Sequence, residues 1–172
     1  MVSGAAFAIW VAVPLSSFSG FALLAAGVLQ AVRISRWVGL LTWREPLVFV
    51  LHCGYAFVPL GFLLVGLSTL WPNVIPASGA LHAWTAGAIA LMTLAVMTRA
   101  SLGHTGHSLT ASVTTRVVYV AAIMAAFSRI AASLLPDLTL DLLSLAAVSW
   151  LVAFGGFVIA YGPKLLRAQL SS

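Results

Sequence analysis

Long runs of apolar residues, separated by short polar connections, are the main pattern along this chain. A helix needs about 20 apolar residues to span the hydrocarbon core of a bilayer. Five runs reach that range, and the alternation of apolar and polar residues that is typical of a barrel strand is absent. Because lipid cannot satisfy backbone groups, these runs are predicted to be helices. Their expected limits are residues 4–30, 46–71, 79–99, 113–135 and 141–161.

The composition agrees with a protein that is embedded in lipid. Of the 172 residues, 62% are hydrophobic and 6% are charged, whereas soluble domains carry roughly 25% charged residues. We therefore predict an all-α, polytopic bundle of about five transmembrane helices that forms a single domain. The positive residues are too few and too dispersed to form a nucleic-acid surface. One cysteine, Cys53, excludes an internal disulfide.

Positive residues lie on alternate connections. The first connection, the third connection and the C-terminal tail contain them. The second connection, PNVIPAS, has no charged residue, and aspartates are the only charged residues of the fourth, PDLTLD. Cytoplasmic loops of membrane proteins carry an excess of Lys and Arg. The pattern thus predicts that the N-terminus is outside and the C-terminus is in the cytoplasm. The residues concerned are Arg33, Arg36, Arg44, Arg99, Arg116, Lys164 and Arg167.

Three polar side chains fall inside the predicted helices. An arginine at mid-helix costs about 2.5–3.5 kcal/mol on insertion scales, so Arg129 should face the bundle or a wet cavity and pair with another group. His52 and His82 lie on helix faces of small or polar residues, which indicates that both point at protein. The alternatives are an Arg129 that bonds carbonyls or snorkels outward, and histidines that are merely hydrogen-bonded in the core. The face predicted for Arg129 contains Tyr119, Ala122, Ala126 and Ser133.

The helical rise separates these residues into two layers. At about 1.5 Å per residue, His52 and Tyr119 lie roughly 9 Å from the cytoplasmic ends of their helices, and Arg129 and His82 roughly 24–25 Å. A separation of about 16 Å is too large for the two histidines to share one haem iron. A histidine that ligates haem alone would leave a position for a small diatomic ligand. Arg129, level with His82, would balance a haem propionate.

The stretch MTRASLGHTGH follows the third helix and contains two further histidines. His104 and His107 would share one face of a helix, but Gly103 and Gly106 favour a turn, since glycine permits a positive φ. Backbone N–H groups of such a turn can bind an anion. With Cys53 and Met97 as soft candidate ligands on the same side, His104 is also a candidate copper ligand. A solvated polar loop is the alternative.

Two stretches resemble the NnrS family of bacterial membrane proteins, namely LHAWTAGAIALMTLAVMTRASLGHTG at 81–106 and WREPLVFVLHCGYAFVPLG at 43–61. The resemblance implies a multi-pass protein of the bacterial inner membrane that carries haem and copper and is linked to nitric oxide and nitrosative stress. It also implies the C-terminal portion of a longer protein, with a missing N-terminal half or a homo-oligomer completing the site. The matching positions are Arg44, Pro46, His52, Tyr55, His82, Arg99, Ser101, Gly103, His104 and Gly106.

The resulting hypothesis is a protein that binds haem b, with copper as a second metal, and handles nitric oxide. Candidate cofactor-binding residues are His52, His82, Arg129, Tyr55 and Tyr119. Candidate metal ligands are His52, His82 and His104, the last placed in a loop under His52. No residue is assigned a catalytic role, and the pattern does not decide whether the protein is an enzyme.

Three other functions fit parts of the pattern. Pro14 and Pro59 inside predicted helices, together with a buried Arg129, are typical of a transporter or channel half. A membrane quinol oxidoreductase of the haem b type would also use histidines at such depths. A structural bundle that completes a larger complex would need the histidines only as hydrogen-bonded core residues.

Overall fold

The structure is a computed structural model that describes residues 1–37 and 39–169, and it confirms the predicted all-helical bundle. No strand occurs in these two ranges. Five helical segments are long and apolar enough to cross a membrane. The side chain of Arg167 lies outside the described part. The five segments are α2 (Ser17–Ser35), α3 (Pro46–Leu70), the continuous run of α4 (Ala77–His82), η2 (Ala83–Ile89) and α5 (Ala90–His104), α6 (Val113–Leu134), and η3 (Pro136–Leu138) with α7 (Thr139–Gln169).

The prediction of one helix over 4–30 is wrong, because the chain turns back near Pro14. Helix α1 (Val2–Ala12) ends there and is too short to count as a span. Proline lacks an N–H group and disfavours helical geometry in the preceding residue, and Val13 has φ −137° and ψ 68°. Ser16 then caps α2 by accepting a hydrogen bond from the backbone N–H of Phe18.

Helices α1 and α2 lie antiparallel and are joined by polar contacts. Gln30 Nε2 donates to Ser3 Oγ over 2.7 Å, which connects the far end of α2 to the start of α1. Ser19 Oγ donates to the carbonyl of Val13 over 2.6 Å at the turn. These bonds satisfy polar groups that would otherwise face lipid or a dry interior.

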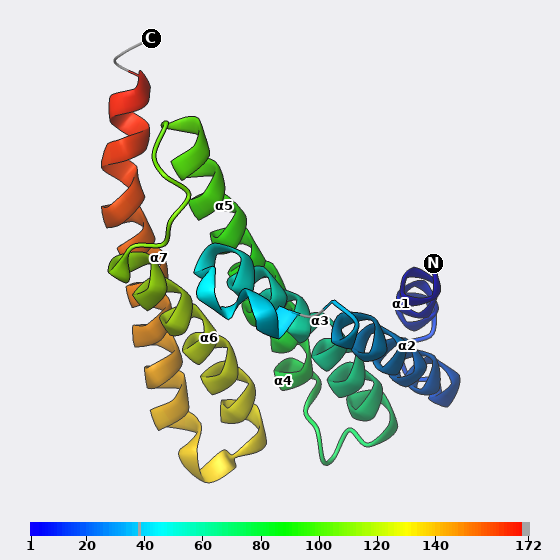
Figure 1. Cartoon of the computed structure of the whole chain (residues 1–172). Helices are drawn as coiled ribbons and strands as arrows, with labels where there is room; N and C mark the ends of the chain where they lie inside the picture. The colour runs from blue at the N-terminus through cyan, green and yellow to red at the C-terminus, as the bar shows by residue number, and fades with distance from the viewer. Residues whose placement is uncertain (38, 170–172) are drawn as a thin grey trace.

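The α4–α5 segment forms the centre of the bundle. It packs against α3 on one side and α6 on the other, while α2 covers α3 and α7 runs along α6 (Figure 1). Glycine allows the closest approaches: Gly61 of α3 lies against the Trp84 indole, and Gly87 of η2 lies against the Phe57 ring. Small residues are the usual means by which membrane helices approach one another. Pro59 is buried inside α3, which continues through it.

Two pairs of buried hydroxyl groups connect α5, α6 and α7. The Thr98 hydroxyl contacts the Tyr119 hydroxyl between α5 and α6. Thr115, one turn before Tyr119 on α6, bonds through Oγ1 to the Tyr161 hydroxyl of α7 over 2.6 Å. All four side chains are buried. Each pair therefore satisfies hydroxyl groups that have little access to water.

Replacing Thr115 by valine should lower the free energy of unfolding by about 1 kcal/mol. Valine fills nearly the same space but leaves the buried Tyr161 hydroxyl without its partner. The matched control is Thr114→Val at the exposed neighbouring position. Thermal unfolding in detergent micelles measures the difference. Equal melting temperatures for the two variants would show that the buried pair contributes no stability.

Candidate functional site

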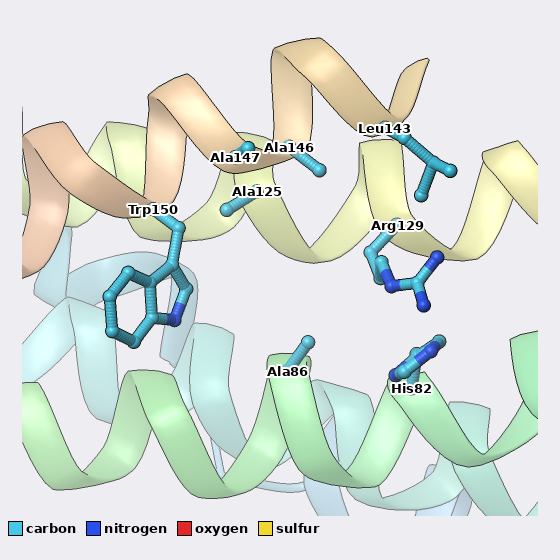
Figure 2. A pocket seen from close by; sticks show the side chains of 8 residues that line it. All are labelled: His82, Ala86, Ala125, Arg129, Leu143, Ala146, Ala147 and Trp150. Atoms are coloured by element: carbon cyan, nitrogen blue, oxygen red, sulfur yellow. The ribbon is translucent and has the colours of Figure 1, made fainter. Parts of the chain in front are cut away.

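A cavity of about 380 Å³ lies between α4–η2, α6 and α7, and both His82 and Arg129 line it. Figure 2 shows the imidazole and the guanidinium facing each other from α4 and α6. Trp150 of α7 lies at the other end of this opening. The prediction that His82 and Arg129 lie in one layer is confirmed. We call this space the His82 cavity; its other walls are Ala86, Ala125, Leu143, Ala146 and Ala147.

The hydrogen-bond partner of the His82 ring is the neighbouring Thr85. Thr85 Oγ1 donates to the carbonyl of Leu81 over 3.2 Å, and His82 Nδ1 lies 3.4 Å from Thr85 Oγ1. In the neutral tautomer that has its proton on Nδ1, Thr85 accepts a long hydrogen bond from Nδ1–H. The lone pair of the neutral ring then lies on Nε2, as in a metal-ligating histidine.

A π-helical segment, Ala83–Ile89, begins directly after His82. Such segments are rare and occur frequently at functional sites. Gly79, one turn before His82, packs against Ser133 of α6. This close approach keeps α4 near α6, where Arg129 is half-buried. The local backbone and the small residue together position the imidazole opposite the guanidinium.

A second cavity, of about 560 Å³, is lined by His52 and Cys53 of α3, by the end of α2 and by η1 (Gly39–Arg44). We call it the His52 cavity. His52 Nδ1 lies 3.2 Å from the carbonyl oxygen of Val48. A carbonyl only accepts, so Nδ1 carries the proton and Nε2 has the free lone pair. The other walls are Ile34, Ser35, Leu41, Phe49 and Ala56.

The first connection, and not the third, lies over His52. The Trp37 ring meets the imidazole edge to face at 6.1 Å between centroids, and the Gly39 backbone lies against the same ring. The loop around His104, predicted to lie under His52, does not line this cavity. Depth along a helix follows from sequence, but the direction of a side chain around the helix axis depends on which neighbour packs there.

Neither tyrosine predicted to bind a cofactor lines one of these cavities. Tyr119 is buried against Thr98, so it does not join His52 as its depth suggested. Tyr55 donates its hydroxyl hydrogen bond to Gln30 Oε1 over 2.8 Å and lies beside the Trp37 ring. Both tyrosines hold helices together, and Tyr55 also supports the tryptophan that covers His52.

Comparison with protein families settles the family of this chain. The NnrS protein family model matches residues 1–169, which is nearly the whole chain. The chain belongs to the NnrS family. No curated protein and no solved structure gave a significant match. The resemblance of residues 43–61 and 81–106 to this family is thereby confirmed, and these two stretches contain the histidines of both cavities.

The third membrane span of this NnrS protein ends later than the predicted limit at residue 99, so the loop that follows it is shorter. Helix α5 continues to His104 and ends in a turn at Gly106, whose φ is 68°. The backbone N–H of His107 bonds to the carbonyl of Leu102, five residues earlier, over 3.0 Å. This is the 6→1 hydrogen bond of a Schellman motif. Gly106 thus has the predicted role in a turn, whereas Gly103 lies inside the helix.

Copper ligands are not assembled around His104 in the part of the NnrS chain that the structure describes. His104 is exposed in the last turn of α5, and His107 bonds through Nδ1 to Thr105 Oγ1 over 2.8 Å. Residues 1–37 and 39–169 contain no group of three or more His, Cys, Asp or Glu side chains that would hold a metal ion. Copper binding by His104 stays a prediction.

Sequence reasoning missed the residues of this NnrS protein that complete each cavity. Trp150 and Leu143 come from α7. This helix is apolar on all its faces, so the sequence alone does not indicate which of its residues face α6. Gly39 and Trp37 come from the first connection, whose arginines predicted its side of the membrane but not its contacts with α3. One signal was present there, since tryptophan is enriched at membrane–water interfaces and Trp37 lies just outside a span.

Proposed function

We propose that this chain is a haem-binding NnrS protein of the bacterial inner membrane that handles nitric oxide, and that the His82 cavity holds the haem. One observation carries the proposal: an imidazole and a guanidinium face each other across a cavity with small apolar walls (Figure 2). These are the groups that haem needs, namely an axial nitrogen, a partner for a propionate and flat apolar surroundings.

Each residue of the cavity would have a distinct task in holding the group. His82 would present Nε2, with Thr85 fixing the other ring nitrogen. Arg129 would neutralise a carboxylate, which also offsets the cost of a charge at this depth. Trp150 would cover one end of the ring. When bound, haem iron supplies a position for a diatomic ligand such as nitric oxide.

The His52 cavity is the second candidate site for such a group. It is larger and mostly apolar, and its histidine has Nδ1 fixed by a backbone carbonyl. A haem or a quinone ring suits a cavity of this kind, so the quinol oxidoreductase alternative depends on His52. The transporter alternative receives less support, since α3 continues through Pro59 and the chain turns at Pro14 between two helices.

The test of the proposed function is an absorption spectrum and an iron analysis of the purified chain in detergent. We expect a Soret band, iron bound in near-stoichiometric amount, and a shift of the band when nitric oxide is added to the reduced protein. Far-UV circular dichroism and gel filtration show whether the preparation is folded. A folded protein that is colourless and free of iron would contradict the proposal.

A further inference from the structure

Three arginines from three different elements line one cavity of about 540 Å³. Arg44 ends η1, Arg99 lies on α5 and Arg116 lies in the first turns of α6. All three side chains are exposed. We call this space the arginine cavity. Its walls also include Glu45, Pro46, Leu47, Val48, Leu109, Thr110 and Ala111.

The charge of the arginine cavity is strongly positive. Glu45 is the acidic residue on its wall, so it balances only one of the three guanidinium groups. The wall also includes the first turn of α3, from Pro46, and the approach to the first turn of α6. Helix N-termini carry partial positive charge. Like charges around one cavity repel one another, and an anion bound among them offsets that repulsion.

The position of the arginine cavity suggests where its anion comes from. It lies at the ends of membrane spans, on the side that the distribution of Lys and Arg assigns to the cytoplasm. Several of its walls are apolar, among them Leu47, Val48 and Leu109. Basic pockets between transmembrane helices at this level are known binding places for phospholipid headgroups. An apolar wall beside three arginines suits a molecule with a phosphate head and an acyl chain.

We propose that the arginine cavity binds a phosphate group, and that the headgroup of an anionic phospholipid of the cytoplasmic leaflet supplies it. Arginine is suited to this task because its planar guanidinium can donate two parallel hydrogen bonds to phosphate oxygens. The Arg44 guanidinium already lies 5.2 Å from the centroid of the Trp43 ring, which restricts its position. The site is separate from both histidine cavities, so its occupancy does not depend on a cofactor.

The test compares two triple variants of the full chain in detergent micelles at fixed salt. The cavity variant is Arg44→Gln, Arg99→Gln and Arg116→Gln. The control variant, Arg33→Gln, Arg36→Gln and Lys164→Gln, removes the same charge from residues that do not line the cavity. Phosphatidylglycerol, phosphatidylcholine and inorganic phosphate are the three probes, and native mass spectrometry measures bound molecules. Circular dichroism confirms that each variant is folded.

We expect the wild type to bind phosphatidylglycerol in preference to phosphatidylcholine, and the cavity variant to bind it roughly 100-fold more weakly. The loss of affinity for phosphatidylglycerol in the control variant should be at least tenfold smaller than the loss in the cavity variant. If inorganic phosphate binds instead and is lost in the same variant, the site is supported and its source is a soluble phosphate. A folded wild type that binds neither phosphatidylglycerol nor inorganic phosphate, or equal losses of affinity in the two variants, would overturn the proposal.

Discussion

Replacing His82 by alanine is expected to lower the Soret absorbance of the purified protein at least about tenfold. The imidazole supplies the axial nitrogen in the proposed site, and its Nε2 is free for the iron when Nδ1–H donates to Thr85. The cavity offers no second imidazole among its walls. Without His82, haem would be left with only apolar contacts and Arg129, which hold it without a bond to iron. Absorbance at equal protein concentration measures the effect.

The control for this variant is His107→Ala, which removes an exposed histidine outside both cavities. It should leave the spectrum unchanged. Adding imidazole to the His82→Ala protein should restore part of the Soret band, since the small ligand can enter the space that the side chain left. An unchanged spectrum in His82→Ala, with the band lost in His52→Ala, would place haem in the His52 cavity and would sink the assignment to His82.

The His82–Arg129 pair could be predicted because the depth of each residue in the membrane follows from its distance, in residues, to the end of its helix. Helix limits in a membrane protein are set by runs of apolar residues, and the rise per residue converts position into depth. An arginine at depth also restricts the choice of partner, since it must meet protein. These two arguments place His82 and Arg129 at one level before any packing is known. The structure then adds that they face the same cavity.

The surroundings of His52 could not be predicted in the same way. The sequence predicts the depth of His52 along α3. The neighbours of His52 depend on the orientation of α3 about its own axis and on the conformation of the first connection. Contacts with Trp37 and Gly39 decide both. Tyr119, which is predicted at the level of His52, is held by Thr98. Depth therefore selects candidates, and packing decides which of them meet.

The break between α1 and α2 shows a different limit of the sequence. Hydrophobicity averaged over 4–30 is high enough for one span, yet the conformation there is decided by a few local groups. Pro14 removes a backbone donor, Ser16 caps the next helix, and Ser19 bonds to the carbonyl of Val13. Each signal was visible in PLSSFS, but a kinked helix was equally consistent with the proline alone.

Replacing Gly79 by alanine is expected to lower the free energy of unfolding by about 1–3 kcal/mol and to weaken the proposed haem site. A β-carbon on Gly79 would lie 2.7 Å from the β-carbon of Ser133 and closer still to its hydroxyl oxygen. Serine cannot rotate its own β-carbon away, so α4 must move from α6. His82 lies one turn further along α4 and would move away from Arg129 with it.

Two variants separate this effect from the ordinary cost of changing a helical glycine. Gly155→Ala is the control, because a β-carbon there meets nothing within 4 Å, so it should be neutral or slightly stabilising. The double variant Gly79→Ala, Ser133→Gly exchanges the two small groups across the contact. The helix propensities of the two changes nearly cancel, so thermal unfolding and Soret absorbance should both return close to wild type. If the double variant were no better than Gly79→Ala alone, the close contact of α4 with α6 would not be what holds His82 opposite Arg129.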